Sequence, residues 1–392
     1  MAASAVQIWM LASQESIVRA AVVLAGARIT VLGCADDNAR PTLAAGFGKV
    51  FSEVPGGVPA GTGHEVRALS DLRSMLASAV PADGPIVLFD AGALLKADRA
   101  GPDAELLRQV RQRGIAVLSL EPLPAVAADL ASAASVIAPA AASMPLVLGP
   151  LEVPVTPERD AAMRLVAELT WWAGLSRHSA GFVEIGDLLT NFGPVQAMAV
   201  TATASRAEGS LRARLADGLD QLAVVMGQAE SVFGVVSKAH EANQQASVLL
   251  RYGNGRSGVV FAALAGGPIQ RSAVMTGPGG RLEITSGPAG TGVLWTDNAG
   301  KVIDQSRKRP RRRAGDSGAQ VAAEGQEKPA HSTIADLVAK QLRRVLETGT
   351  TDVLAASGRP DLAGLVATIG AAELSSDTGV AERPAMLLSA AG

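Results

Sequence analysis

In the first part of the chain, segments with the apolar spacing of strands alternate with segments that have the spacing of helices. Short, mostly apolar runs, typical of buried strands, lie at residues 6–11, 28–34, 85–92 and 115–123. Between them, residues 16–26 and 102–114 have helical spacing, and the second stretch opens with Pro-Asp and stops at a glycine. Strand, helix and strand units with short connections predict an α/β fold with a Rossmann-like, doubly wound parallel sheet.

The second part of the chain has a different pattern. Strand-like runs separated by N-G, G-P-G-G and D-N-A-G turn sequences lie at residues 193–204, 246–264, 272–287 and 292–304. Among them lies a helix-like stretch at 210–227, and two amphipathic stretches at 332–349 and 360–379 follow, each closed by a glycine. Consecutive hairpins predict a C-terminal α+β domain with a large, mostly antiparallel sheet and helices on one face.

These patterns predict two domains and a helical tail. With 392 residues, the chain exceeds the size at which a single hydrophobic core stops growing. We expect a Rossmann-like dinucleotide-binding-type domain over residues 1–150 and an α+β domain for substrate binding and oligomerisation over 151–330. The helices of residues 331–392 are expected to pack back on the first domain.

Composition narrows the classes of partner. Aromatic residues make up 3% of the chain and the net charge is −2, which argues against recognition of single-stranded nucleic acid. The basic run at 306–313 precedes a segment with linker composition, so we interpret it as an exposed insertion rather than a nucleic-acid contact. Cys34 is the single cysteine, and no histidine has metal-ligand spacing, so no metal site is predicted. Without a signal sequence or membrane-length apolar stretch, a soluble, cytoplasmic protein is expected.

The segment LASQES at residues 11–16 lies where a dinucleotide-binding βαβ unit carries its G-x-G-x-x-G turn. It has no glycine, but Ser13 and Ser16 are placed to cap the helix that follows, whose N-terminus attracts anions. Asp36 and Asp37 lie roughly 20 residues further on, where such proteins hold the ribose hydroxyls. The alternative interpretation of Asp36 is a turn residue after a strand.

Three segments of the second half carry a resemblance to a known family. VLLRYGNGRSGVV, TGPGGRLEI and ATIGAAELSSDTGVAERP resemble the C-terminal half of the Gfo/Idh/MocA oxidoreductases, the group of glucose-fructose oxidoreductase and inositol dehydrogenase. The first half resembles the Rossmann domain of that family. The resemblance implies NAD or NADP as the cofactor, a small sugar-like ligand, and a homodimer or homotetramer formed through the open face of the second sheet.

The catalytic positions implied by the resemblance are altered here. The family's E-K-P lysine falls at Glu121, and the histidine of its D-x-G-x-H-x-x-D helix falls at Asp217, while Asp220 matches the final aspartate. An ordinary exposed aspartate ionises near pH 4, far from the near-neutral value that suits acid/base exchange. Asp217 has the alternative interpretation of a solvated carboxylate at the rim of a cleft. His178, after the TWWAGLSRH stretch, is the candidate substrate-binding histidine, with a surface histidine as its alternative.

Two functions are compatible with these residues. In the first, the chain is a catalytically degenerate homologue that acts as a binding or regulatory protein and binds NAD(P) weakly or not at all. In the second, it is an active NAD(P)-dependent oxidoreductase of sugars or polyols. The missing glycines, lysine and histidine are three separate departures from the family pattern, so we favour the first.

Overall fold

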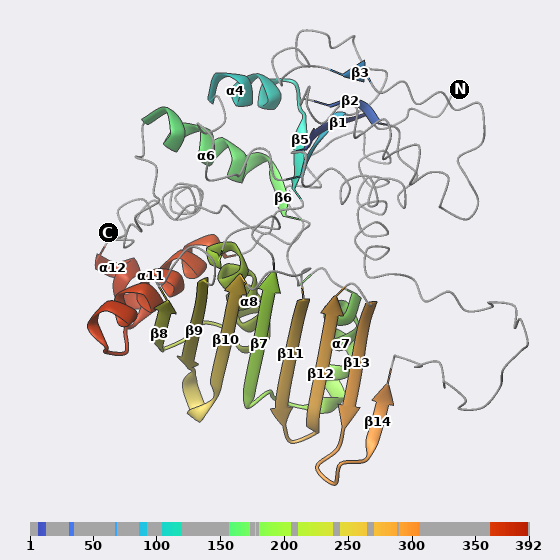
Figure 1. Cartoon of the computed structure of the whole chain (residues 1–392), viewed down its shortest axis with the longest axis vertical. Coiled ribbons are helices and arrows are strands. Elements are labelled where there is room, and N and C mark those ends of the chain that lie inside the picture. The colour runs from blue at the N-terminus through green and yellow to red at the C-terminus, as the bar shows by residue number, and fades with distance from the viewer. Residues whose placement is uncertain are drawn as a thin grey trace, which may run out of the picture.

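The structure is a computed structural model of the chain. It describes residues 7–12, 31–34, 67–68, 86–91, 104–119, 157–172, 177, 180–204, 211–237, 244–264, 270–287, 290–305 and 361–390. These residues form two sheets with their helices (Figure 1). In the described segments, no helix is long and apolar enough to cross a membrane.

The first sheet is entirely parallel. Its strands are β1 (Gln7–Ala12), β2 (Val31–Cys34), β3 (Arg67–Ala68), β4 (Ile86–Ala91), β5 (Ala116–Ser119) and β6 (Thr170–Trp172). Their spatial order is β3-β2-β1-β4-β5-β6, the order of a doubly wound dinucleotide-binding sheet. The parallel sheet expected from the sequence is therefore present. It extends beyond residue 150, where we expected the first domain to end, because β6 pairs with β5.

Two helices accompany this sheet. Helix α4 (Ala104–Gln112) lies between β4 and β5 in the chain, and α6 (Pro157–Leu169) precedes β6. Gly114, at φ +65°, adopts the left-handed conformation that ends α4, as the sequence predicted. The two helices pack against each other.

The second sheet has eight strands and is mostly antiparallel. They are β7 (Ala197–Ala204), β8 (Ser231–Ser237), β9 (Gln244–Arg251), β10 (Ser257–Leu264), β11 (Gln270–Gly277), β12 (Gly280–Gly287), β13 (Gly290–Thr296) and β14 (Val302–Gln305). Their order is β14-β13-β12-β11-β7-β10-β9-β8, and β7 and β10 are the one parallel pair among the described strands of this second sheet. At the predicted N-G turn, Asn254 and Gly255 both have positive φ, which matches the twist of a tight hairpin.

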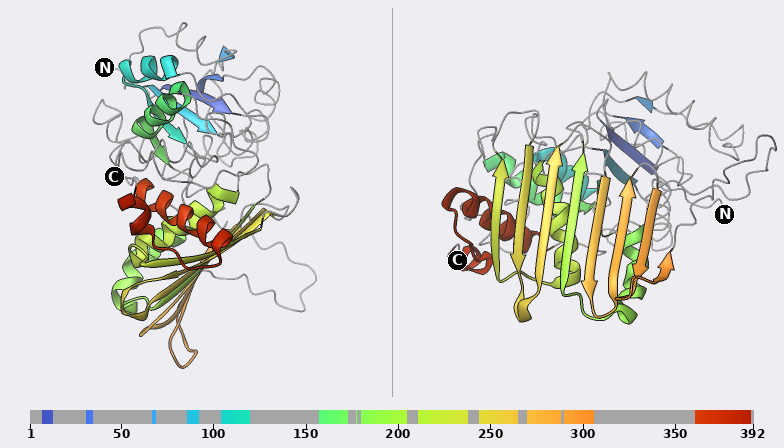
Figure 2. Two further views of the ribbon diagram at one scale, coloured as in Figure 1. Left: turned by 90° about the vertical axis from the view of Figure 1, so that its left-hand side faces the viewer. Right: turned by 60° about the horizontal axis from the view of Figure 1, so that its bottom comes forward.

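Helices cover one face of this second sheet (Figure 2). Helix α8 (Leu211–Met226) lies over β7, β10 and β9, while α7 (Ala180–Phe192) lies over β12 and β13. Gly218 allows α8 to lie close to the sheet, since a Cβ there would approach Val260 Cγ1 to 2.7 Å. The covered face carries a row of paired, buried residues: Val248, Val260, Val200, Ala273, Ile284 and Val293.

The C-terminal helices pack differently from our expectation. Helix α11 (Leu362–Thr378) contacts β8 and α8, and α12 (Pro384–Ala390) packs on α11. We expected these helices to pack back on the first domain; the contacts described for α11 are with the second sheet and its helix. Its apolar residues, among them Leu365, Val366 and Ile369, belong to the core beneath the second sheet. The stretch at 332–349 lies outside the described residues.

The opposite face of the second sheet has exposed apolar side chains. Phe233 pairs with Leu249, and Leu249 pairs with Val259, so the three form a row across β8, β9 and β10. Their exposed fractions are 39%, 45% and 39%, and the neighbouring Val235 is 56% exposed. We call these four residues the open apolar face.

Candidate functional site

Helix α8 is the element on which the candidate catalytic carboxylates lie. It packs on the second sheet and also contacts α11, with its residues from Ala213 to Leu222 all buried. Four polar residues lie within this buried section: Arg214, Asp217, Asp220 and Gln221. Because a charged group in a protein interior requires a partner, the ion pairs of this helix decide what its carboxylates can do.

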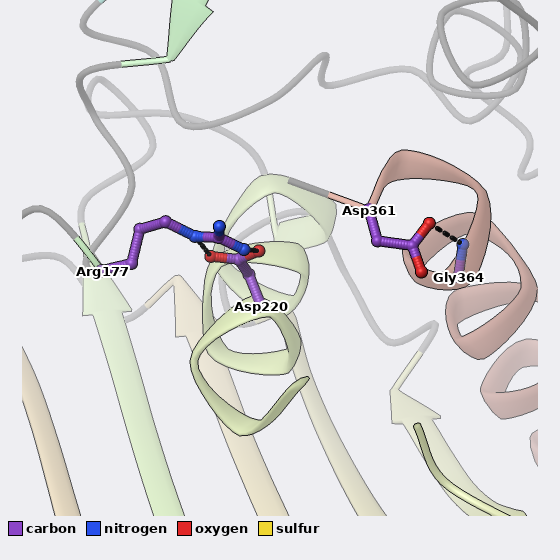
Figure 3. A network of polar contacts seen from close by, with 4 residues as sticks. All are labelled: Arg177, Asp220, Asp361 and Gly364. Carbon is purple, nitrogen blue, oxygen red and sulfur yellow. Dashed lines mark hydrogen bonds and ion pairs between the residues drawn. The ribbon is translucent and has the colours of Figure 1, made fainter. Parts of the chain in front are cut away.

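Asp220 is held by Arg177, which lies between β6 and α7 (Figure 3). Arg177 Nε donates a hydrogen bond to Oδ2 of Asp220 at 2.6 Å, and Nη2 donates to Oδ1. This two-point contact occupies both carboxylate oxygens of a side chain that is 1% exposed. Burial raises the pKa of Asp220 above its usual value, the hydrogen bond and charge of Arg177 oppose this rise, and Asp217 and Asp361 add to it.

Asp217 is paired with Arg271 of β11. The Arg271 Nε and the Asp217 Oδ2 lie 2.8 Å apart, and the side chains are 10% and 0% exposed. Arg271 pairs in register with Ala202, which is buried on the face that α8 covers. The interpretation of Asp217 as a solvated carboxylate at the rim of a cleft is therefore wrong. The physical reason is that α8 packs with Asp217 facing the sheet, where the Arg271 guanidinium lies on the covered face.

A cavity of about 280 Å³ runs along α8 from the Arg177–Asp220 pair. Its walls come from α8, the end of β9 and the first turns of α11, and include Leu219, Val224, Leu250, Tyr252, Asp361 and Thr368. Asp361 caps α11: its Oδ1 accepts a hydrogen bond from Gly364 N at 3.0 Å (Figure 3). Gln228 Nε2 also donates to its Oδ2, at 3.4 Å. The cavity is thus mainly apolar, with a neutralised ion pair and one capping carboxylate.

Tyr252 is one of the residues that line this cavity. It is 3% exposed, and burial raises the pKa of its hydroxyl further above 10, so the phenol stays protonated at neutral pH. The Arg256 guanidinium lies 5.9 Å from its ring centroid and donates to the carbonyl of Met226 at the C-terminal end of α8. The phenol and the guanidinium can orient a small ligand by hydrogen bonding.

The structure brings together two of the predicted site residues, Asp217 and Asp220. The other candidates lie outside the described residues: Ser13, Ser16, Asp36, Asp37, Glu121 and His178. In the part of the chain that the structure describes, no group of three or more His, Cys, Asp or Glu residues is placed to hold a metal ion.

Sequence reasoning missed three residues of this region. Arg271 is the one charged residue of β11, where alternation places it on the covered face, so its need for a buried partner was open to prediction. Asp361 directly precedes a helix, which is a capping signal. Arg177 carries no such signal, because its partner is 43 residues away along the chain.

Comparison with solved structures shows which proteins share this fold. A putative NADPH-dependent oxidoreductase from Desulfitobacterium hafniense is 13% identical, with a TM-score of 0.60, over 99% of this chain and 100% of that one. A putative myo-inositol dehydrogenase from Sinorhizobium meliloti is 11% identical, with a TM-score of 0.56, over 96% and 99%. Levoglucosan dehydrogenase in complex with NADH and L-sorbose is 13% identical, with a TM-score of 0.55, over 97% and 99%.

No protein-family model matches the chain, and no curated protein sequence matches it either. The structural neighbours are oxidoreductases of the Gfo/Idh/MocA type, as the resemblance in the sequence implied. The chain therefore has the fold of inositol and levoglucosan dehydrogenases along nearly its whole length.

Proposed function

We propose that this chain is a catalytically degenerate Gfo/Idh/MocA-type protein, which binds a small sugar-like ligand in a binding or regulatory role and does not transfer hydride. The observation that carries the proposal is the buried pair of Asp217 and Arg271. By the resemblance, Asp217 stands where the family has its acid/base histidine. A carboxylate that pairs with a buried guanidinium is engaged in compensating that charge, so it is not presented to a substrate hydroxyl.

Asp220 supports the same conclusion. It matches the final aspartate of the family's helical motif, but both of its oxygens accept hydrogen bonds from Arg177. The two carboxylates of α8 therefore each neutralise an arginine, and neither faces a reacting group alone. In this proposal both carboxylates hold α8 in place.

The fit of NAD or NADP depends on the turn after β1. The order of the sheet changes direction between β1 and β4, which is where dinucleotides bind in such folds. The residues that follow β1 are Ser13, Gln14 and Glu15, with no glycine to admit a pyrophosphate. We therefore propose weak or absent binding of NAD(P), with Asp36 and Asp37 available to a ribose only if the cofactor enters.

The alternative function is an active NAD(P)-dependent oxidoreductase of sugars or polyols. The observation that favours it is the parallel sheet, whose strand order matches that of dinucleotide-binding proteins. Several structural neighbours were also solved with NAD⁺ or NADH bound. In this case Glu121 and His178 would have to supply the substrate binding and the proton transfer that the α8 carboxylates do not.

One experiment separates the two functions. The purified chain is incubated with NAD⁺ or NADP⁺ and a panel of polyols and sugars, while nicotinamide absorbance reports reduction and calorimetry reports ligand binding without cofactor. The proposal expects binding of at least one polyol or sugar and no reduced nicotinamide. Cofactor reduction that depends on the sugar, and that is lost in His178→Ala, would establish the alternative.

A further inference from the structure

Strand β8 is the edge of the second sheet, and its sequence is suited to pairing with another strand. Residues 231–237 read SVFGVVS, with no charge and no proline, and four of the seven are β-branched or aromatic. An uncharged edge strand of this kind presents free backbone groups on which another chain can add a strand. Phe233 and Val235 of this strand belong to the open apolar face, and their exposed side chains would add to the attraction for another chain.

The C-terminal segment occupies this edge. The amide of Val232 donates to the carbonyl of Glu382 at 2.7 Å, and the amide of Glu382 donates back at 2.8 Å. The next two outward amides of β8 find hydroxyl acceptors on α11. Gly234 N donates to Ser375 Oγ at 3.2 Å, and Val236 N donates to Ser376 Oγ at 3.0 Å. The alternate amides 232, 234 and 236, which point away from β9, are therefore all bonded.

Small residues permit this close approach. A Cβ at Gly234 would overlap the backbone carbonyl of Ala372, so the helix lies directly against the strand. Ser375 is fully buried at the contact. The buried residues of α11 that precede it include the small Gly370 and Ala371. The left-handed Gly379 then ends α11 and turns the chain so that Glu382 reaches Val232. Figure 1 shows α11 and α12 beside β8 at this end of the sheet.

We propose that residues 372–382 are an intramolecular guard of the β8 edge, which prevents strand addition by β8 of a second copy of this chain. A second copy is the occupant that the strand itself specifies, because an uncharged, apolar segment is complementary to an identical segment in antiparallel pairing. The guard differs from an ordinary packed helix in that its serine hydroxyls replace the carbonyls of a neighbouring strand. This role does not depend on NAD(P) or on a sugar ligand.

The test removes the two hydroxyls in the full chain, as Ser375→Ala with Ser376→Ala. Amide hydrogen exchange is expected to speed up at Gly234 and Val236 by about fivefold or more, because each loses its acceptor. Light scattering is expected to show assemblies larger than those of the parent chain at the same concentration. Ser389→Ala is the matched control, since Ser389 bonds within exposed α12, and it should change neither measurement.

A third substitution identifies the surface through which the variant associates. A Val236→Pro substitution is added to the double variant. The Val236 amide points away from β9, so proline removes a donor that an added strand would need and leaves the hydrogen bonds between β8 and β9 in place. The extra association should therefore be abolished if strands add at this edge. Association that persists in this triple variant would overturn the proposal and indicate contact through the open apolar face. Unchanged exchange and unchanged mass in the double variant would also overturn it. If the double variant does not fold, Ser376→Ala alone carries the same test at Val236.

Discussion

Arg271 of β11 and Asp217 of α8 form an ion pair that is buried on both sides, with 2.8 Å between Nε and Oδ2. The pair joins the helix that carries the candidate catalytic carboxylates to the sheet beneath it. Asp217, which stands where the resemblance implies a proton-transfer residue, is therefore engaged in an ion pair that holds the helix to the sheet.

Removing one member of this pair should destabilise the protein strongly. Asp217→Asn leaves the Arg271 guanidinium buried without its countercharge, and we expect a loss of about 3–5 kcal/mol in the free energy of unfolding. Replacing both residues, as Asp217→Leu with Arg271→Met, should recover much of this loss because no buried charge is then left alone. Urea denaturation measures both. If Asp217→Asn unfolds at the same urea concentration as the parent, Asp217 is not the countercharge of Arg271.

The stability contributed by Asp220 should fall as pH rises. Its pKa in the folded state is raised above the usual value of 3.8, so between these two values the folded chain binds more protons than the unfolded chain. The free energy of unfolding therefore decreases through this window. We expect the stability of the parent relative to Asp220→Asn to decline as pH increases from about 4. Thermal or urea unfolding across a pH series measures this difference, and a rise over the same range would show that Arg177 outweighs burial.

NADH and NADPH should bind weakly. Besides the side chains at the three glycine positions, the segment carries Glu15, whose negative charge we expect near the phosphates of a bound cofactor. At an effective dielectric constant of about 20, a like charge ~4–6 Å away costs about 3–4 kcal/mol before screening, which weakens binding about a hundredfold or more. Titration by nicotinamide fluorescence tests this, and Glu15→Gln should tighten binding. A micromolar dissociation constant for the parent chain would contradict the prediction.

The open apolar face should join two copies of the chain. Leu249 of β9 and Val259 of β10 are exposed at 45% and 39%, near the β8 edge of a sheet whose other face is covered by helices. We expect a homodimer or a dimer of dimers, and Leu249→Lys should give a monomer because the charge would have to be desolvated at the interface. Val302→Lys, on β14 with a similar exposure of 49%, is the control. Light scattering at micromolar concentration measures the mass, and a monomeric parent chain would refute the dimer.

Local sequence determined most of the elements that the structure describes. Helix α8 was expected at residues 210–227 and spans Leu211–Met226, because its apolar spacing and closing glycine act within a few residues. The N-G turn at Asn254 likewise depends on backbone conformations that those two residues adopt by themselves. Asp217 and Asp220 were placed on the correct helix for the same reason.

Tertiary structure decided what those elements contact. Arg177 and Arg271 lie far along the chain from the carboxylates that they neutralise, and spacing within α8 does not specify either partner. The attachment of α11 to β8 depends on a glycine in one element and serines in another, about 140 residues apart. The same holds for β6, which joins the first sheet by pairing with β5. Periodicity encodes which face of an element is buried, whereas only the folded chain brings distant charges and backbone donors within bonding distance.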